Sequence, residues 1–244
     1  MVVPSFITVR TLSSRLPKKC LLPFGDGNIL EHVIRRSKHY GLYPIVCTTV
    51  DQSDDIISDI AQKENVKCFR GNPINKLKRW LDCCVSFNIH RFHTIDADDP
   101  FFDGDQVKQS FFLLEEGYDM ICPTVSSSAG GASVGYSLTT NVVSRACKLF
   151  GEGEDTEMMW YYIEKVEGVR TIILPENSSN PIRVRLTLDY QEDYWLLQTV
   201  QRIVGNLAHR KDVEELFRRN PDLHKVNWFR NDEWKQAQLA KKRT

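Results

Sequence analysis

Short apolar runs alternate with amphipathic helical patterns over the first half of this 244-residue chain. The runs expected to form strands are Phe6–Val9, Pro44–Thr48, Val66–Phe69, Arg91–Ile95 and Met120–Cys122. Strands that are joined through helices pair in parallel by right-handed crossovers. The sequence therefore predicts an α/β fold, an open and mostly parallel sheet flanked by helices.

The first helical pattern begins at a capping box. Asn28 offers a side-chain acceptor and Glu31 follows three residues later, a spacing at which each side chain satisfies a backbone donor of the other residue. Leu30, Val33 and Ile34 then share one face of the helix. We expect this face to pack on the sheet.

The second half of the chain has less regular patterns. Ser126–Gly135 consists of small residues and reads as a linker or as a mobile loop over a site. Helices are expected around Val142–Phe150 and Thr156–Val166, and strands at Val169–Leu174 and Val184–Leu188. We treat residues 1–244 as a single domain, because one core of this size suits the length.

Composition restricts the possible partners and the location. The chain has 32 Lys and Arg residues against 32 Asp and Glu residues, so no overall field favours nucleic acid or an anionic membrane. No apolar stretch approaches the roughly 18 residues that span a bilayer. Seven cysteines without a Cys-x-x-Cys pair indicate reduced thiols. We expect a cytoplasmic protein that binds small molecules.

A basic loop follows the first expected strand. Its polar side chains include Arg10, Ser13, Ser14, Arg15 and Lys19. Guanidinium groups, an ammonium group and hydroxyls together suit a triphosphate, although a solvated basic turn has the same composition. The sequence therefore makes phosphate binding a hypothesis at this loop.

Acidic residues follow two other expected strands. Asp96, Asp98 and Asp99 follow the fourth strand, and Asp189 ends the strand expected at 184–188. Parallel strands end at one edge of a sheet, so the acidic group should face the basic loop. Carboxylates beside phosphate oxygens suit magnesium, and Asp98 and Asp189 are the candidate ligands. We expect Asp96 and Asp99 to cap turns around Pro100 instead, and Asp193 to face solvent.

The order of motifs resembles the cytidylyltransferase family. The motifs are Arg10-x-x-Ser13-x-Arg15-Leu16-Pro17-x-Lys19, Leu22-Pro23-x-Gly25, Leu30-Glu31-His32-Val33-Ile34, Phe69-Arg70-Gly71, Leu77-x-Arg79-Trp80, Ala97-Asp98-x-Pro100 and Arg185-Leu186-Thr187-Leu188-Asp189-Tyr190-x-Glu192-Asp193. The similarity runs over about residues 5–228 and is greatest to the spore coat polysaccharide biosynthesis protein F group. This family includes synthetases that make CMP-activated Kdo and sialic-type sugars.

The resemblance implies a Rossmann-like nucleotidyltransferase that uses CTP and Mg²⁺. It would transfer CMP to an acidic sugar of the Kdo or nonulosonate type and release pyrophosphate, for surface polysaccharide biosynthesis. Carried over residue by residue, the nucleotide contacts are Arg10, Ser13, Ser14, Arg15, Lys19, Arg70 and Arg79, with Arg15 and Lys19 catalytic, and the metal ligands are Asp98 and Asp189. The segment 126–183 would bind the acceptor and form a homodimer contact.

Three alternatives remain open. A sugar-1-phosphate nucleotidyltransferase using UTP or GTP would share the fold, although such enzymes open with a glycine-rich loop. A glycosyltransferase would use Asp96-x-Asp98 for its metal but would release a nucleoside diphosphate. A catalytically inactive nucleotide-binding homologue is suggested by Leu12, where relatives often carry glycine, and by the acidic residues within 154–157.

Overall fold

The structure is a computed structural model that describes residues 2–176 and 182–241. Within these ranges it contains a seven-stranded sheet of order β5-β4-β1-β6-β8-β7-β9. The strands are β1 (Pro4–Thr8), β4 (Tyr43–Thr49), β5 (Lys67–Gly71), β6 (Arg91–Asp96), β7 (Met120–Cys122), β8 (Ser137–Thr139) and β9 (Thr171–Ile173). A separate antiparallel pair is formed by β2 (Pro23–Phe24) and β3 (Gly27–Asn28).

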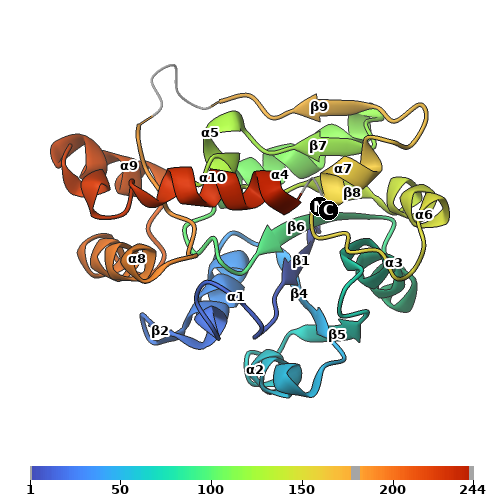
Figure 1. Cartoon of the computed structure of the whole chain (residues 1–244), viewed down its shortest axis with the longest axis horizontal. Coiled ribbons are helices and arrows are strands. Elements are labelled where there is room, and N and C mark those ends of the chain that lie inside the picture. Colours follow the sequence, from blue (N-terminus) through green and yellow to red (C-terminus); the bar gives the residue numbers. More distant parts are fainter. Residues whose placement is uncertain (1, 177–181, 242–244) are drawn as a thin grey trace.

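Helices cover the sheet on both sides. They are α1 (Ile29–His39), α2 (Asp55–Lys63), α3 (Lys76–Phe87), α4 (Gly104–Leu113), α5 (Val125–Ser128), α6 (Thr140–Leu149), α7 (Met159–Ile163), α8 (Gln191–Val204), α9 (Arg210–Arg219) and α10 (Arg230–Lys241). Short 3₁₀ turns occur at Lys19–Leu21, Gln52–Asp54, Leu114–Glu116 and Leu223–Val226. In Figure 1, α3 and α6 lie on one side of the strands, α1 on the other, and α10 crosses the middle of the view. The predicted Rossmann-like architecture is confirmed.

Adjacent residues of β1 show how the core is divided. Ile7 packs with the residues of α1, α2 and α4, whereas Phe6 packs with those of α3, α6 and α7. This alternation follows from the two-residue period of a strand that is buried on both faces. A third apolar cluster joins α8 and α9 to Leu186 and Leu188.

The capping box of α1 forms as expected. The Asn28 side chain accepts the backbone N–H of Glu31 at 2.9 Å, and the Glu31 carboxylate accepts the backbone N–H of Asn28 at 2.9 Å. Leu30, Val33 and Ile34 are fully buried. The helix begins at Ile29 and therefore presents its apolar face to the sheet, as its sequence predicts.

Several expectations for the second half are wrong. The segment 184–188 is buried but is not a strand of the sheet, because its backbone forms isolated hydrogen bonds from Leu186 to Gly130 and from Leu188 to Asp98 and no strand ladder. The helix expected at 156–166 is only α7. β8 was not foreseen and pairs antiparallel with both β6 and β7. No helix in the described ranges is both long enough and apolar enough to cross a membrane.

A buried histidine connects β6 to β8. His93 is fully buried, and its Nε2 and Nδ1 lie 2.7 Å from the Val134 carbonyl oxygen and from Ser137 Oγ respectively. Burial lowers the pKa of His93 from 6.5 to about 4. The unfolded chain therefore binds a proton more readily than the folded protein between these pH values, and stability is lost as the pH falls.

We expect this histidine to make the protein acid-sensitive. The free energy of unfolding should fall by on the order of 3 kcal/mol between pH 7 and pH 4 because of His93 alone. Urea unfolding at a series of pH values would measure this, with His93→Gln giving a flatter profile. His90→Gln is the matched control, because His90 is exposed and lies directly before β6. Equal slopes for wild type and His93→Gln would contradict the prediction.

Candidate active site

A cavity of about 670 Å³ opens beyond the carboxyl ends of β1 and β6. These strands are parallel neighbours, and Thr8 lies opposite Asp96 in their register. The loops that follow both strands therefore begin side by side, as the topology predicts. Eight of the nine proposed site residues line this cavity, namely Arg10, Ser13, Ser14, Arg15, Lys19, Arg79, Asp98 and Asp189.

The basic loop is anchored at its base. The backbone N–H and the hydroxyl of Thr11 donate to Asp54 Oδ1 at 2.8 and 2.7 Å. The backbone N–H of Lys18 donates to the Thr11 carbonyl at 3.1 Å and closes the loop. Lys18 itself adopts a left-handed conformation, with φ of 54°. The loop is thus a closed turn that presents Arg15 and Lys19 to the cavity.

Lys19 joins the two acidic elements. Its ammonium nitrogen lies 2.6 Å from Asp98 Oδ2 and 2.9 Å from Asp189 Oδ1, and it donates to the Leu188 carbonyl at 2.7 Å. Burial alone would lower the pKa of Lys19, but the two carboxylates more than offset this and raise it. Asp98 and Asp189 therefore converge on one position, which carries a positive charge.

The two carboxylates have opposite electrostatic environments. Arg15 Nη2 lies 2.6 Å from Asp189 Oδ1, so Asp189 faces two cations at that oxygen. Burial acts to raise the pKa of Asp189, but Lys19 and Arg15 together hold it below its usual value. Burial raises the pKa of Asp98, and the single cation Lys19 does not reverse this. Asp189 is thus the more strongly ionised of the pair.

The remaining acids of the 96–99 turn have structural roles. Asp99 is buried, and its carboxylate accepts the Thr187 hydroxyl at 2.6 Å, which ties the turn to the 184–189 segment. Asp96 Oδ1 accepts Lys76 Nζ at 3.1 Å. The turn itself closes through the backbone N–H of Asp99 and the carbonyl of Asp96 at 3.1 Å. Asp96 therefore stabilises the turn through its backbone carbonyl, whereas its carboxylate faces the cavity.

A second group of charges was missed by sequence reasoning. Lys76, at the start of α3, has its side chain only 7% exposed and lies 3.9 Å from Glu157 Oε1, while Arg10 Nη2 lies 3.4 Å from Glu157 Oε2. Lys76 and Glu157 line the same cavity. The only signal in the sequence was the adjacency of Lys76 to the capping Asn75, which does not reveal a buried ammonium.

Arg70 and Arg79 take different positions. Arg79 lines the cavity and donates from Nη1 to the Asn72 carbonyl at 2.6 Å. Arg70 does not line it; its guanidinium donates to the carbonyls of Thr49 and Asp51 and lies 2.6 Å from Asp55 Oδ1. The structure therefore does not bring Arg70 to the cavity.

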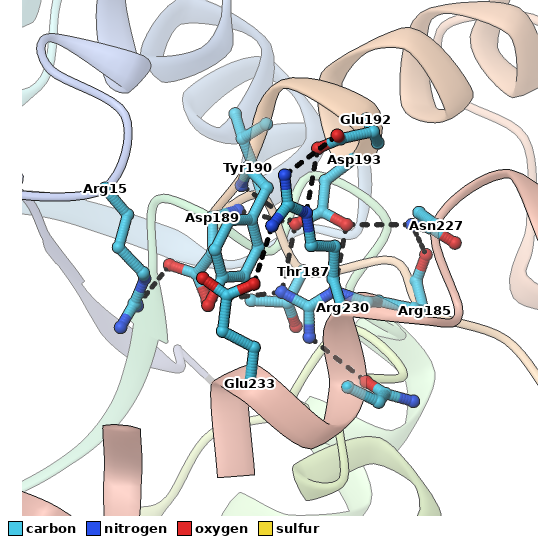
Figure 2. A network of polar contacts seen from close by, with 12 residues as sticks. Arg15, Arg185, Thr187, Asp189, Tyr190, Glu192, Asp193, Asn227, Arg230 and Glu233 are labelled. Carbon is cyan, nitrogen blue, oxygen red and sulfur yellow. Dashed lines mark hydrogen bonds and ion pairs between the residues drawn. The ribbon is translucent and has the colours of Figure 1, made fainter. Parts of the chain in front are cut away.

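Asp193 faces inward, contrary to expectation. It is fully buried and forms a two-point ion pair with the fully buried Arg185, with Nε–Oδ1 2.8 Å and Nη2–Oδ2 2.9 Å (Figure 2). Both residues belong to the motif around Asp189, at spacings of four residues. That regular spacing is the feature of the sequence that could have predicted a contact between Arg185 and Asp193.

The open, mostly parallel sheet of this chain, whose basic loop faces two aspartates in the cavity, is shared as a fold with solved cytidylyltransferase structures. The chain belongs to the cytidylyltransferase family, whose pattern, described as Cytidylyltransferase, matches residues 5–162. The expected family is thereby confirmed, and the protein is an enzyme of the nucleotidyltransferase type.

Individual relatives agree with this assignment. The spore coat polysaccharide biosynthesis protein SpsF of Bacillus subtilis is 26% identical over 233 residues, which cover 88% of this chain and 94% of that protein. A cytidylyltransferase structure from Leptospira borgpetersenii has a TM-score of 0.78 at 23% identity, covering 91% of this chain and 96% of the other. CMP:2-keto-3-deoxy-manno-octonic acid synthetase, solved in complex with CTP, has a TM-score of 0.62 at 14% identity, covering 83% and 98%.

Proposed function

We propose that the protein transfers CMP from CTP to an acidic sugar and releases pyrophosphate. The observation that carries this proposal is the junction of Lys19 with Asp98 and Asp189 inside the cavity. It combines a cation on a basic loop, of the kind that suits phosphate, with two carboxylates that converge on its nitrogen. The family and the CTP complex of a structural relative support cytosine as the base of the nucleotide.

The triphosphate would lie along the basic loop. Arg10, Arg15 and Lys19 supply positive charge on one wall of the cavity, and Ser13 and Ser14 supply hydroxyl donors. In this structure each of the three cations is paired with a carboxylate of the protein itself. Phosphate oxygens would compete for the same donors, so nucleotide binding would replace these internal ion pairs.

The two aspartates fit a magnesium ion. Asp98 Oδ2 and Asp189 Oδ1 both lie within 3 Å of the Lys19 nitrogen, so they converge on a position where a cation is favoured. Two carboxylates with phosphate oxygens are the ligand set that Mg²⁺ prefers. When bound there, Mg²⁺ would draw charge from the α-phosphate and help to ionise the acceptor hydroxyl. Lys19 would have to leave this position as the ion enters.

The chain's own residues then position the reaction. A hydroxyl of the sugar attacks the α-phosphorus of CTP, the new oxygen–phosphorus bond forms, and the bond to the bridging oxygen of pyrophosphate breaks. Arg15 and Lys19 stabilise the negative charge that develops on the leaving pyrophosphate. Asp98 and Asp189, held on loops at one sheet edge, fix the geometry for attack.

The acceptor would bind through the segment 126–183. The assignment is supported by four residues of this segment that line the cavity, namely Ser127, Ser133, Tyr136 and Trp160. Residues 177–181 of the segment lie outside the described residues. We propose a role in surface polysaccharide synthesis from the likeness to SpsF, and a homodimer from the family.

The direct test is pyrophosphate release with each of the four nucleoside triphosphates, Mg²⁺ and a panel of acidic sugars and sugar 1-phosphates. We expect turnover with CTP and an acidic sugar, and little with UTP or GTP. Preference for UTP or GTP with a sugar 1-phosphate would overturn the proposal in favour of the related sugar-1-phosphate enzymes. Tight CTP binding without turnover across the whole panel would indicate a binding protein.

A further inference from the structure

The position of Asp189 is not set by the sheet. The 184–188 segment that leads to it is not a strand, and the backbone N–H of Leu188 makes a single bond of 2.7 Å to the carbonyl of Asp98. A residue that has to hold a cation needs a defined carboxylate position. Side chains around Asp189 must therefore supply the order that a strand would otherwise give.

Asp193 fixes the backbone at Asp189. Its Oδ2 accepts the backbone N–H groups of Asp189 and Tyr190 at 2.9 and 3.0 Å, at the beginning of α8. Its Oδ1 accepts Asn227 Nδ2 at 2.9 Å. With the two contacts from Arg185, both oxygens of Asp193 are fully used, so this carboxylate has one defined orientation (Figure 2).

Arg185 orients the carboxylate of Asp189. Oδ1 of Asp189 faces Arg15 and Lys19 in the cavity, whereas Oδ2 lies 3.5 Å from Arg185 Nη2 on the buried side. The Arg185 guanidinium is also held from α10, where Asn231 Oδ1 accepts Nη1 at 3.2 Å. The two oxygens of Asp189 are thus divided between the core and the cavity.

We propose that the buried Arg185–Asp193 ion pair positions Asp189 so that one of its oxygens remains available to the metal. This inference rests on the proposed function, in which Asp189 is a metal ligand. Arg185 and Asp193 are positioning residues, because neither lines the cavity among the described residues. Partners behind a metal ligand typically contribute 10- to 100-fold to metal affinity.

The test removes both charges together, because a single loss leaves an unpaired buried charge that destabilises the fold. The double variant Arg185→Met with Asp193→Leu should bind Mn²⁺ about 10- to 100-fold more weakly than wild type in the presence of CTP. Water-proton relaxation by Mn²⁺ measures this without turnover, corrected for the Mn²⁺–CTP complex alone. CTP affinity in EDTA should stay within about two-fold, since the basic loop is unchanged.

A matched control removes another pair between α8 and α10. Arg230 Nη2 lies 2.9 Å from Glu192 Oε1, and neither residue contacts the Asp189 carboxylate. Arg230→Met with Glu192→Leu should leave Mn²⁺ affinity unchanged. A folded Arg185→Met, Asp193→Leu protein with Mn²⁺ affinity within two-fold of wild type overturns the inference.

Two further variants complete the design. If the double variant does not fold, Arg185→Lys is judged by the same criterion, because lysine keeps the charge but cannot make the two-point contact. Asp189→Asn tests the proposed function itself. Wild-type Mn²⁺ affinity in Asp189→Asn would overturn the metal role of Asp189, whereas weak binding there and normal binding in the double variant would overturn only the positioning role.

Discussion

Replacing Lys19 with methionine should lower CTP-dependent pyrophosphate release by about 10²- to 10³-fold, the usual loss when one preorganised donor to a developing charge is removed. Lys19 is the only side chain whose nitrogen lies within 3 Å of both Asp98 and Asp189 among the described residues. Its charge acts most on the leaving pyrophosphate, so the loss should appear in kcat more than in KM for CTP. Steady-state kinetics with saturating acceptor would measure it.

Lys18→Met is the control for this experiment. Lys18 is the preceding residue, is exposed and does not line the cavity, so its replacement should leave kcat unchanged. Excess Mg²⁺ distinguishes two roles of Lys19. If Lys19 were only a counter-ion for the aspartates, raising Mg²⁺ would restore turnover to Lys19→Met, and that result would contradict a contact with the triphosphate.

The first half of the fold could be predicted because its patterns are long and locally consistent. The capping box at Asn28 and the stripe of Val33 and Ile34 specify α1 without help from distant contacts. β8 could not be predicted in the same way. It has only three residues, Ser137–Thr139, and it exists because β6 and β7 each offer it an antiparallel edge.

The 184–188 segment shows where an apolar pattern is insufficient. Val184, Leu186 and Leu188 are buried as a strand pattern predicts, but they pack against α8 and α9 and not within the sheet. Periodicity indicates which side chains are buried, and it does not identify the partner of the backbone. The pairing is decided by tertiary contacts, here with Gly130 and Asp98.

The candidate site follows the same division. Arg15, Lys19 and Asp98 could be brought together from sequence because they follow parallel strands that end at one edge. Asp189 was expected at this edge as well, but the segment before it is not a strand, and the backbone of Leu188 bonded to Asp98 brings it there. The inward direction of Asp193 could not be predicted in this way. Asp193 pairs with the buried Arg185, and Arg185 in turn donates to Asn231 in α10, which lies far along the chain. Arg70 is placed away from the cavity by Asp55, a contact between β5 and α2 that no local pattern encodes.

Asparagine replacements at the two aspartates should separate catalysis from stability. Both Asp98→Asn and Asp189→Asn should reduce turnover by about 10²- to 10³-fold, since a metal ligand supplies several kcal/mol of transition-state stabilisation. Asp189→Asn should also destabilise the fold by about 3 kcal/mol, because it leaves Lys19 and Arg15 without the buried carboxylate they share. Pyrophosphate assays and urea unfolding at pH 7 would measure the two effects.

Asp98→Asn should instead leave the stability within about 1 kcal/mol of wild type, because burial already disfavours the charge of Asp98. The pKa values of Asp189 and Asp98 are shifted in opposite directions, and these shifts also predict that the Asp189 substitution destabilises the fold more. The pKa of Asp189 is lowered, so its carboxylate stabilises the fold above the usual pKa of an aspartate, and this contribution is lost in acid. The pKa of Asp98 is raised, so ionisation of Asp98 opposes folding near pH 7. Equal destabilisation by both substitutions would show that Lys19 depends on the two carboxylates alike.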